Sequence, residues 1–387
     1  MDYFFTEEQQ MIRDVAREIA DKRIRPVAAE FDESGEFPWE VTKAIAEADL
    51  FRVFIPEEYG GMDMGTPIMN MCIVTEELSK ACGGISLGFA ATGLGTMPIL
   101  IAGSDEQKAK YLPRIADGTL AAFGLTEANA GSDAGAVATK AVKDGSDYIL
   151  NGTKQWITNG GEAEIYTIFC VTDPARGARG VSTIIVEKDT PGFTFGKKEN
   201  KMGIRASATR ELIFQDCRVP QENLLGKEGM GFFNAMKTFD VSRPGVASQA
   251  LGIAQGALDL AVQYSRERHQ FGQPISSFQG LRWMLADMAM KVEAARALIY
   301  ATARWIDAAK PKKAAIYSAM AKCFASDVAM EVTTNALQVF GGYGYMKEYP
   351  IEKYMRDAKI TQIYEGTNQI QREEIGKGLI AAAAAGE

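Results

Sequence analysis

A glutamate near the C-terminus stands in a segment that suits acid–base chemistry. Glu365 lies in the sequence IYEGTNQIQR, between Tyr364 and Gly366. A carboxylate becomes a useful general base when burial raises its pKa and a substrate proton lies within hydrogen-bonding reach. Glu365 is nevertheless one of 50 acidic residues in the chain, and most such residues are solvated at the surface. Its surroundings must decide between the two interpretations.

Four further segments carry groups that could bind a charged or planar ligand. FGGYGY (340–345) and LTEANAGSD (125–133) offer backbone amides that could approach a phosphate. Taken in isolation, a glycine C-cap with its turn is the favoured interpretation of the first, and a plain loop explains the second equally well. WITNGG (156–161) is either a ligand wall or a core tryptophan with a turn. Arg243 in FDVSRPG is either a cation for an anionic ligand or an ordinary helix residue beside Pro244.

The histidine and cysteine counts exclude several mechanisms. The chain has a single histidine, His269, in the polar segment SRERHQFGQP, with no GxSxG motif near it. One histidine cannot build a histidine-rich metal site, and a surface position is the simplest interpretation of His269. The five cysteines are scattered and form no CxxC pair, which is typical of reduced intracellular thiols. We therefore expect no metal centre and no disulfide framework.

Composition indicates a soluble globular protein of more than one structural unit. The chain has 387 residues, an apolar fraction of 47%, a charged fraction of 24% and a net charge of -8. The acidic balance argues against nucleic-acid binding, which depends on clustered lysine and arginine. No apolar run is long enough to cross a membrane, and the acidic N-terminus has no signal or transit pattern. We therefore expect a cytoplasmic location.

The elements that must position these residues are helical in the first third of the chain. Thr6 and Gln9 have capping-box spacing, a run of apolar residues to Ile19 follows on one helical face, and Pro26 is expected to stop the run. The stretch Ile85–Ala102 is apolar and uncharged, as expected of a buried segment. Further helices are predicted at Trp39–Ala48, Thr66–Lys80 and Asp105–Ile115.

The periodicity changes near Phe123 to that of short strands. Tyr148–Leu150 and Lys154–Ile157 flank Asn151-Gly152 and predict a hairpin with a type I′ turn. Further strands are predicted at Ile165–Val171, Val181–Val186, Phe193–Phe195 and Glu211–Val219, at the spacing of an antiparallel sandwich or barrel.

Helical periodicity returns from Phe232 onward and suggests an antiparallel bundle. The terminal AAAAAGE is expected to be a frayed tail. The order predicts an α+β protein: an N-terminal helical domain (1–121), a middle antiparallel β-sandwich or barrel domain (122–228) and a C-terminal four-helix bundle (229–387). Ligands are expected at the borders of the strand block. The helices of the last domain are predicted at Val246–Arg268, Phe278–Ile306, Ala314–Phe340 and from Gln369.

Taken together and in order, the motifs resemble those of the acyl-CoA dehydrogenase family. They are LTEANAGSD, WITNGG, FDVSRPGVASQALGIAQGAL, RHQFGQPISSFQ, QVFGGYGY and RDAKITQIYEGTNQIQ, and the resemblance runs nearly end to end. The similarity is to the short- and medium-chain members, in particular the butyryl-CoA dehydrogenase-like ones. The resemblance implies the fold predicted above from periodicity alone.

The resemblance implies a reaction in which an acyl-CoA becomes a trans-2-enoyl-CoA. Glu365 would remove the α-proton while the β-hydrogen leaves as hydride to N5 of FAD. The backbone N–H of Glu365 and a ribityl hydroxyl of FAD would stabilise the enolate oxygen. Isovaleryl-type relatives place the base at the position of Ser242, and a serine there cannot act as that base.

The resemblance also implies the ligand contacts and a homotetramer, a dimer of dimers. Some FAD contacts would come from a neighbouring subunit, so a monomer should bind flavin poorly. The implied FAD contacts are Phe123, Leu125, Thr126, Gly131, Ser132, Trp156, Ile157, Thr158, Thr367 and Gln369, with Arg268, Gln270, Phe271, Gln279, Gln338, Gly341 and Gly342 at the shared end. The implied substrate contacts are Ser132, Asp240, Arg243, Tyr364, Gly366 and Lys377.

The electron acceptor and the acyl group are less defined. The resemblance implies electron-transferring flavoprotein as acceptor. An acyl-CoA oxidase using dioxygen, a flavin monooxygenase or nitroalkane oxidase on the same fold, and a non-catalytic CoA- or flavin-binding scaffold are the alternatives. A short- to medium-chain acyl group, straight, branched or cyclic, is expected, and the absence of Lys and Arg from Gly83–Ser104 disfavours a dicarboxyl substrate. The small residues Ala90–Gly93 either leave room for the acyl group or pack two helices together.

Overall fold

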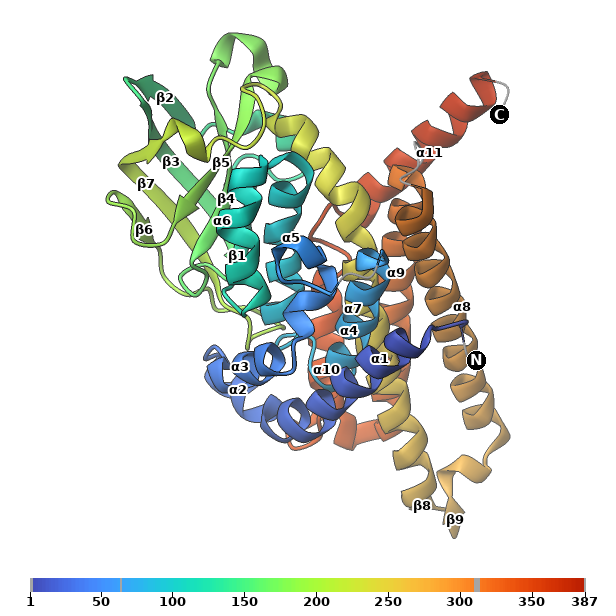
Figure 1. Ribbon diagram of the computed structural model, residues 1–387. Coiled ribbons are helices and arrows are strands. Elements are labelled where there is room, and N and C mark those ends of the chain that lie inside the picture. The colour runs from blue at the N-terminus through green and yellow to red at the C-terminus, as the bar shows by residue number, and fades with distance from the viewer. Residues whose placement is uncertain (1–2, 63–64, 310–313, 386–387) are drawn as a thin grey trace.

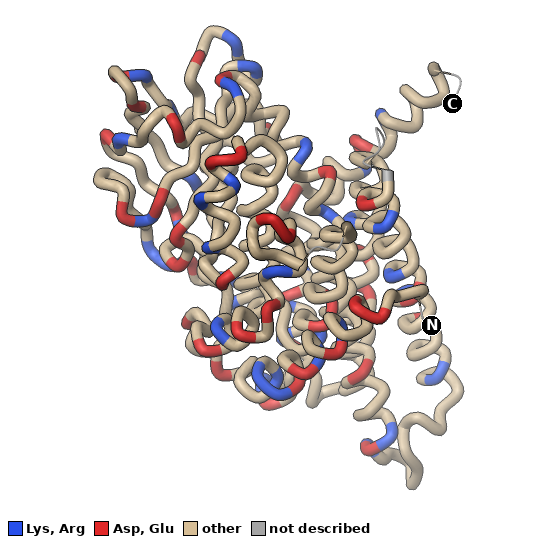
Figure 2. The backbone as a smooth tube through the Cα atoms, in the orientation of Figure 1, with Lys and Arg blue, Asp and Glu red and all other residues tan. Residues whose placement is uncertain are grey.

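The computed structural model describes residues 3–62, 65–309 and 314–385. Helices of the N-terminal third and the long C-terminal helices lie side by side, and the β-sheet stands against one end of them (Figure 1). The order of helices, strands and helices agrees with the sequence prediction, and so does the fold class. Lysine and arginine are interspersed with aspartate and glutamate over all three parts (Figure 2).

The N-terminal helices begin where the capping signals place them. Thr6 accepts a hydrogen bond from the backbone N–H of Gln9, and the Gln9 side chain completes the capping box. The expected stop at Pro26 is wrong, because Pro26 lies in the first turn of a 3-10 segment, where its missing N–H costs nothing. A π-helical turn (Ala20–Ile24) joins that segment to the preceding helix. The helices are α1 (Glu7–Ile19), α2 (Ala28–Ser34), α3 (Trp39–Glu47), α4 (Pro67–Ala81), α5 (Leu87–Ala102) and α6 (Asp105–Ala116).

The middle of the chain forms a seven-stranded sheet of order β1-β4-β2-β3-β7-β6, with β5 paired to β4. Pairing is antiparallel as predicted for β2–β3, β3–β7, β4–β5 and β6–β7, but β1 pairs with β4 in parallel. The parallel pair is possible because the chain crosses over through β2 and β3 between these strands. The strands are β1 (Ala121–Gly124), β2 (Lys140–Asp144), β3 (Asp147–Thr158), β4 (Ile165–Val171), β5 (Val181–Glu187), β6 (Phe193–Phe195) and β7 (Thr209–Pro220).

The hairpin predicted at Asn151-Gly152 is wrong. Both residues lie inside the continuous strand β3, where the pairing with β7 shifts register between Leu150 and Gly152. Gly152 has φ +147°, and a Cβ there would lie 2.7 Å from the Cα of Thr139. The Asn-Gly pair therefore makes a bulge with a close backbone approach. The hairpin turn lies earlier, at Gly145 (φ +62°), between β2 and β3.

The C-terminal helices are longer than the sequence suggested. The predicted helix from Val246 is the second part of α7, which has 37 residues and continues through Pro244. The short helix α10 was missed, and the expected frayed tail is wrong because α11 stays helical to Ala384. The helices are α7 (Gly231–Glu267), α8 (Gln279–Ala309), α9 (Ala314–Phe340), α10 (Ile351–Ile360) and α11 (Asn368–Ala384), and the two-residue strands β8 (His269–Gln270) and β9 (Gln273–Pro274) join α7 to α8.

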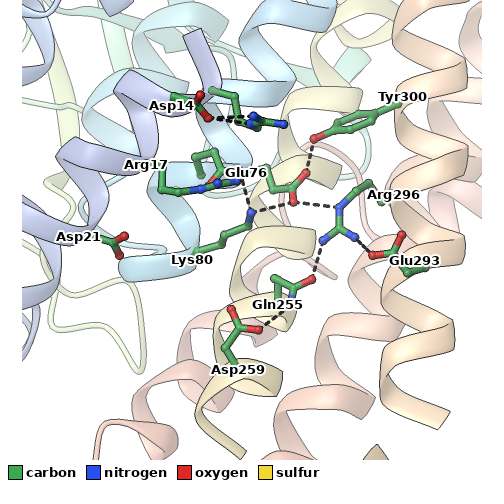
Figure 3. Close-up of polar contacts among 12 residues, drawn as sticks. Asp14, Arg17, Asp21, Glu76, Lys80, Gln255, Asp259, Glu293, Arg296 and Tyr300 are labelled. Carbon is green, nitrogen blue, oxygen red and sulfur yellow. Dashed lines mark hydrogen bonds and ion pairs between the residues drawn. The ribbon is translucent and has the colours of Figure 1, made fainter. Parts of the chain in front are cut away.

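A buried charge network holds the N-terminal helices against the C-terminal ones (Figure 3). Glu76 on α4 is 1% exposed and accepts a hydrogen bond of 3.0 Å from Nε of Arg296 on α8. Tyr300 on α8 and Lys80 on α4 contact the same carboxylate, and Gln255 on α7 contacts Arg296. Because each buried charge has a partner, the network fixes the relative positions of three helices.

Within residues 3–62, 65–309 and 314–385, no helix is long and apolar enough to cross a membrane. In the same ranges, no group of three or more histidine, cysteine, aspartate or glutamate side chains could hold a metal ion. The five cysteines are buried and free. His269 is exposed, as predicted.

Candidate active site

A cavity of about 560 Å³ lies where the sheet meets the helices. Its walls come from α4, α5, β1, β3, α7, the loop after β1 and the segment between α10 and α11. Both N-terminal and C-terminal helices contribute, so the cavity forms only when the three parts of the chain pack together. The predicted site residues among its lining are Phe123, Leu125, Thr126, Gly131, Ser132, Trp156, Ile157, Thr158, Arg243, Tyr364, Glu365 and Gly366.

Glu365 projects from the segment between α10 and α11 into this cavity. Its backbone has φ +50°, a left-handed conformation that is uncommon outside glycine and often marks a functional position. The hydroxyl of Ser242 on α7 donates a hydrogen bond of 2.8 Å to Oε2 of Glu365. Burial raises the pKa of Glu365, while the Ser242 hydrogen bond and the charges of Arg243 and Lys322 oppose that rise. The carboxylate of Glu365 thus has a raised pKa and an orientation held by Ser242, and nearby positive charges offset part of the cost of its burial.

The backbone around Glu365 is fixed by side chains from two helices. Nε2 of Gln371 donates to the carbonyl oxygens of Glu365 (2.9 Å) and Gly366 (3.0 Å). Nε of Arg243 also reaches the Glu365 carbonyl, at 3.4 Å. Gly366 follows with φ +90°, so two successive residues are left-handed. The sharp turn needs glycine at the second position and these donors to hold it.

Arg243 is engaged on several sides and is only 4% exposed. Its Nη1 lies 2.6 Å from Oε2 of Glu374, which also lines the cavity, and its guanidinium lies over the ring of Phe239. Glu374 was not predicted. The carboxylate of Glu374 thus compensates the positive charge of Arg243. Because Glu374 belongs to α11, that helix helps to orient the Arg243 side chain.

Two predicted substrate contacts do not line the cavity. Asp240 is half-buried near Arg243, and burial raises its pKa to about 6, opposed by Arg243. Its backbone carbonyl accepts a hydrogen bond from Ser318. Lys377 is exposed and pairs with Glu373 at 2.8 Å on the surface of α11.

Another part of the cavity wall is aromatic and partly exposed. Trp156 is 57% exposed and has φ +58°, so its ring stands out from β3 instead of packing in the core. Asn159, also left-handed with φ +61°, fixes this end of β3 by donating to the Ala121 carbonyl (3.2 Å) and to Thr92 (3.3 Å). Trp156 is therefore not a core tryptophan; it lines the cavity.

A buried ion pair that the sequence did not reveal supports this wall. Lys154 is 0% exposed, and its Nζ donates to Oε1 of Glu127 (2.7 Å) and to the Leu125 carbonyl (3.1 Å). The Glu127 carboxylate also accepts the backbone N–H groups of Ala138 and Thr139. The pair ties β3 to the loop that carries Thr126 and Ser132. In the sequence, only the alternation of inward- and outward-facing positions along β3 indicates that Lys154 points inward.

The small residues of α5 serve both purposes that the sequence left open. Ala90 and Ala91 line the cavity. Thr92 instead accepts hydrogen bonds from Nδ2 of Asn159 (3.3 Å) and from the backbone N–H of Ala121 (3.4 Å), and a Cβ on Gly93 would lie 3.0 Å from Sδ of Met71. The first pair borders the open space of the cavity, and the second pair packs α5 against its neighbours.

Of the remaining predicted FAD residues, Thr367 and Gln369 lie in the chain between the cavity-lining Gly366 and Ile370, and the others lie away from the cavity. Arg268 follows the C-terminal end of α7, about 33 Å along the helix axis from Val246, which lines the cavity. Its guanidinium lies over the ring of Tyr343, and Phe271 nearby is 92% exposed. Thr367 is the N-cap of α11. We call the residues beyond α7 the far-end cluster: Arg268, Gln270, Phe271, Gln279, Gln338, Gly341 and Gly342.

Comparisons with known proteins identify the family. Family models described as the acyl-CoA dehydrogenase N-terminal, middle and C-terminal domains match residues 6–119, 122–217 and 229–380. A short-chain specific acyl-CoA dehydrogenase of Clostridium acetobutylicum is 49% identical, over 96% of this chain and 98% of its own.

Two solved structures share the fold along nearly the whole chain. Butyryl-CoA dehydrogenase from Megasphaera elsdenii superposes with a TM-score of 0.95 at 47% identity, covering 98% of this chain and 100% of its own. The second chain belongs to a structural study of the electron transferring flavoprotein of Acidaminococcus fermentans, directed at the mechanism of flavin-based electron bifurcation. It superposes with a TM-score of 0.94 at 52% identity, covering 98% of this chain and 99% of its own.

The cavity wall fits the cofactor of this family. The apolar side chains of Trp156, Phe123 and Leu125 line the cavity together with two hydroxyl-bearing residues, Thr126 and Thr158. A Cβ on Gly131 would meet no atom within 4 Å, so its backbone faces open space. A planar ring with hydrogen-bonding edges suits this wall. The chain belongs to the acyl-CoA dehydrogenase family and is an FAD-dependent oxidoreductase.

Proposed function

We propose that this protein oxidises short-chain acyl-CoA thioesters to trans-2-enoyl-CoAs, with Glu365 as the general base. The observation that carries the proposal is the position of Glu365: it lines the same cavity as Trp156, it is oriented by Ser242, and burial raises its pKa. A thioester α-proton is weakly acidic, and a base of raised pKa in a desolvated pocket is what its removal requires.

The residues around Glu365 divide the work of the proton transfer. Ser242 holds one carboxylate oxygen, which leaves the other free to meet the substrate α-proton. The charge of Arg243 opposes the rise in the pKa of Glu365 that burial causes. FAD, when bound, supplies the acceptor for the β-hydride. The protonated carboxyl formed in this step is the form that burial favours.

The turn at Glu365 offers a donor for the thioester oxygen. Across the described part of the chain, none of the groups accepts a hydrogen bond from the backbone N–H of Glu365, whereas its carbonyl is held by Gln371. A fixed and unoccupied N–H beside the base can stabilise the negative charge that develops on the thioester oxygen. The left-handed backbone at Glu365 is what exposes this group.

A neutral and short acyl group suits the part of the cavity that α4 and α5 line. The lining residues there are Met71, Thr75, Leu87, Ala90, Ala91 and Leu94, none of which carries a charge. Gln249 and Tyr364 close it by a hydrogen bond to each other, and Gln249 also holds the Gly83 carbonyl at 2.8 Å. Because the cavity of about 560 Å³ must also hold the flavin ring and the thioester, a short chain is favoured over a long one. The similarity to short-chain relatives supports the same choice.

The CoA moiety is expected at the edge of the cavity where Ser132 and Arg243 lie. Tyr364 and Gly366 then border the thioester. Asp240 and Lys377 stand outside the cavity and remain weaker members of the proposed set.

We further propose that FAD is shared between two subunits of a homotetramer. The cavity holds the contacts expected for the flavin ring, but the far-end cluster of the same chain is too distant to join them. The exposed apolar side chains of Phe271 (92%), Trp283 (62%) and Met290 (63%) lie on the same part of the molecule and suit burial against another copy. Thr367 and Gln369 belong to the proposed FAD set next to the cavity.

As electron acceptor we propose electron-transferring flavoprotein, and as location the cytoplasm. The first rests on the similarity to a chain in the Acidaminococcus fermentans structure on that flavoprotein. The second rests on five buried free cysteines, which are typical of a reducing compartment.

The test is an anaerobic titration of the purified yellow protein with a panel of acyl-CoAs while the oxidised-flavin absorption band is recorded. We expect rapid bleaching by butyryl-CoA and its neighbours in length, weaker bleaching by long chains and none by glutaryl-CoA. A protein that no thioester bleaches would contradict the proposed reaction, and preferential bleaching by long or dicarboxyl esters would contradict the proposed substrate.

A further inference from the structure

A lysine is buried directly beneath the segment that carries Glu365. Lys322 on α9 is 0% exposed. Its Nζ donates hydrogen bonds to the carbonyl oxygen of Gly366 (2.7 Å) and to Oδ1 of Asn368 (3.0 Å). A buried ammonium group is costly unless its donors are used, and here it is directed at the backbone next to the base. No step of the proposed reaction so far uses the hydrogen bonds that Lys322 donates.

The neighbouring residues on α9 hold the same segment without a positive charge. Ser326, one turn after Lys322, accepts a hydrogen bond of 2.8 Å from Nδ2 of Asn368. Asp327 accepts from the same amide nitrogen (2.8 Å) and from Gln362 (2.7 Å). Because residues four apart share one helical face, α9 presents a row of polar groups to the turn. Lys322 is the cation in this row.

The charged groups around Lys322 leave Glu365 as its main electrostatic partner. Burial lowers the pKa of Lys322 to about 8, and Glu365 is the foremost opposing charge. Arg243 from α7 works against the charge on Lys322, but Glu374 on α11 pairs with that arginine. On α9, Cys323 and Asp327 face the lysine.

Asp327 already has another cationic partner. It pairs with Arg372 from α11 at 2.5 Å. Near pH 7, below the pKa of about 8, Lys322 is protonated and lowers the pKa of Glu365. Its charge therefore acts on the base more than on any other acid nearby.

We propose that Lys322 is a positioning residue for the reaction, because its ammonium holds the Gly366 carbonyl and favours the ionised form of Glu365. The proposal rests on the proposed role of Glu365 as base. Lys322 does not touch the substrate; it acts through the turn at residues 365–366. The turn is held twice, by Gln371 through an uncharged amide and by Lys322 through a charge.

The test isolates proton removal from flavin reduction. An acyl-CoA in which sulfur replaces the β-carbon has α-protons but no β-hydrogen to transfer, so the holoenzyme can only exchange its α-protons with solvent. Exchange in deuterium oxide is followed by mass spectrometry across pH. Exchange requires ionised Glu365, so the rate falls as pH drops through the pKa of Glu365.

Lys322→Gln removes the charge but keeps an amide that can donate to Gly366. We expect the pKa of Glu365 to rise by about one unit, which shifts the acid limb of the profile to higher pH. Exchange should then fall about tenfold at pH values below the limb and approach the wild-type rate at high pH. Lys322→Arg retains the charge and should restore the position of the limb, even if the longer side chain slows exchange at every pH.

A second variant covers the case in which Lys322→Gln fails to fold. Asn368→Asp keeps the shape of the side chain but gives Lys322 a closer carboxylate, so the limb should again shift to higher pH. As a matched control, Lys353→Gln removes a buried lysine that pairs with Asp357 and not with the turn, and its exchange profile should keep the wild-type limb.

Two outcomes would overturn the proposal. One is a profile of Lys322→Gln that superimposes on the wild type. The other is an equal loss at every pH that Lys322→Arg does not correct, which would show a purely structural role. Glu365→Gln in the same assay separates the two proposals, because exchange that persists in this variant removes Glu365 as the base, whatever Lys322 does.

Discussion

Two regions along α7 differ in how many side-chain contacts they receive from the same chain. One is the cavity, and the other is the far-end cluster beyond the C-terminal end of the helix. At the cavity, Glu365, Ser242 and Arg243 contact one another and are backed by Gln371. At the far end, Phe271 is 92% exposed and the Arg268 guanidinium lies over a ring and not against an acid. The same helix thus leads from a group of side chains that contact one another to a group that is exposed.

This difference indicates which function each end has. Buried and paired charges determine the geometry of a reaction centre in advance. Exposed aromatic side chains and glycine-rich backbone instead suit a surface that is completed by a second copy. We therefore expect changes at the cavity end to affect chemistry or folding, and changes at the far end to affect cofactor retention.

The largest effect is expected from Lys154→Met, which leaves the Glu127 carboxylate buried without its partner. Loss of one member of a buried pair costs about 3–5 kcal/mol of stability, so the thermal midpoint of the holoenzyme should fall strongly. Lys143→Met removes a pair with Glu228 on the same sheet, where Lys143 is 55% exposed, and should cost less than about 1 kcal/mol. Equal midpoints for the two variants would contradict the structural role of Lys154.

Arg268→Ala tests the far end. If Arg268 completes a neighbour's FAD site, its loss should weaken FAD retention by about tenfold or more, since a hydrogen bond to a charged group contributes about 1.5–3 kcal/mol. Flavin content after dialysis, with the oligomeric state measured alongside, checks this. Arg266→Ala, two residues earlier on α7, is the matched control. Full FAD occupancy in an intact oligomer of Arg268→Ala would remove the shared-site proposal.

Arg243→Ala tests the cavity edge, where one side chain holds both the Glu365 carbonyl and Glu374. We expect the Kd for acyl-CoA to rise about tenfold, because a binding cation is lost and Glu374 is left unpaired. Arg243→Ala combined with Glu374→Gln should recover part of the loss. Unchanged acyl-CoA affinity in the single variant, measured by calorimetry, would discredit the CoA role of Arg243.

The smallest effect is expected from Ser242→Ala. The hydroxyl donates to ionised Glu365 and so lowers its pKa. Without it the pKa rises further, and the acid limb of substrate-driven flavin reduction should move to higher pH by less than about one unit. Above that limb the rates of the variant and the wild type should converge. A shift to lower pH would show that the hydrogen bond does not stabilise the carboxylate.

The sequence predicted the fold class because most of its local signals agree with the tertiary structure. The capping residue Thr6 and the helix Ala314–Phe340 lie where periodicity places them. Local signals misled where packing decided. Gly152 looks like a turn residue, but the close approach of Thr139 makes it a bulge, and Pro26 tolerates a 3-10 turn instead of ending the helical path.

The candidate site was predictable only in part. Family motifs predicted Glu365 and Trp156 as site residues, but Ser242, Glu374 and Lys322 act through contacts between residues 44 or more positions apart, Lys322 and Gly366 being the nearest pair. A pattern along the chain contains no information on such pairs. Burial and charge compensation, which become visible only in the folded chain, are what single them out.

An anaerobic stopped-flow experiment with butyryl-CoA that compares wild-type protein with Glu365→Gln tests most directly whether Glu365 is the base. We expect the variant to keep its FAD and to bind the thioester, yet to lose flavin reduction by about 10²–10⁴-fold or more, because general-base catalysis supplies a factor of that size. Flavin reduction at the wild-type rate in a folded, FAD-containing Glu365→Gln protein would contradict the assignment of Glu365 as the base.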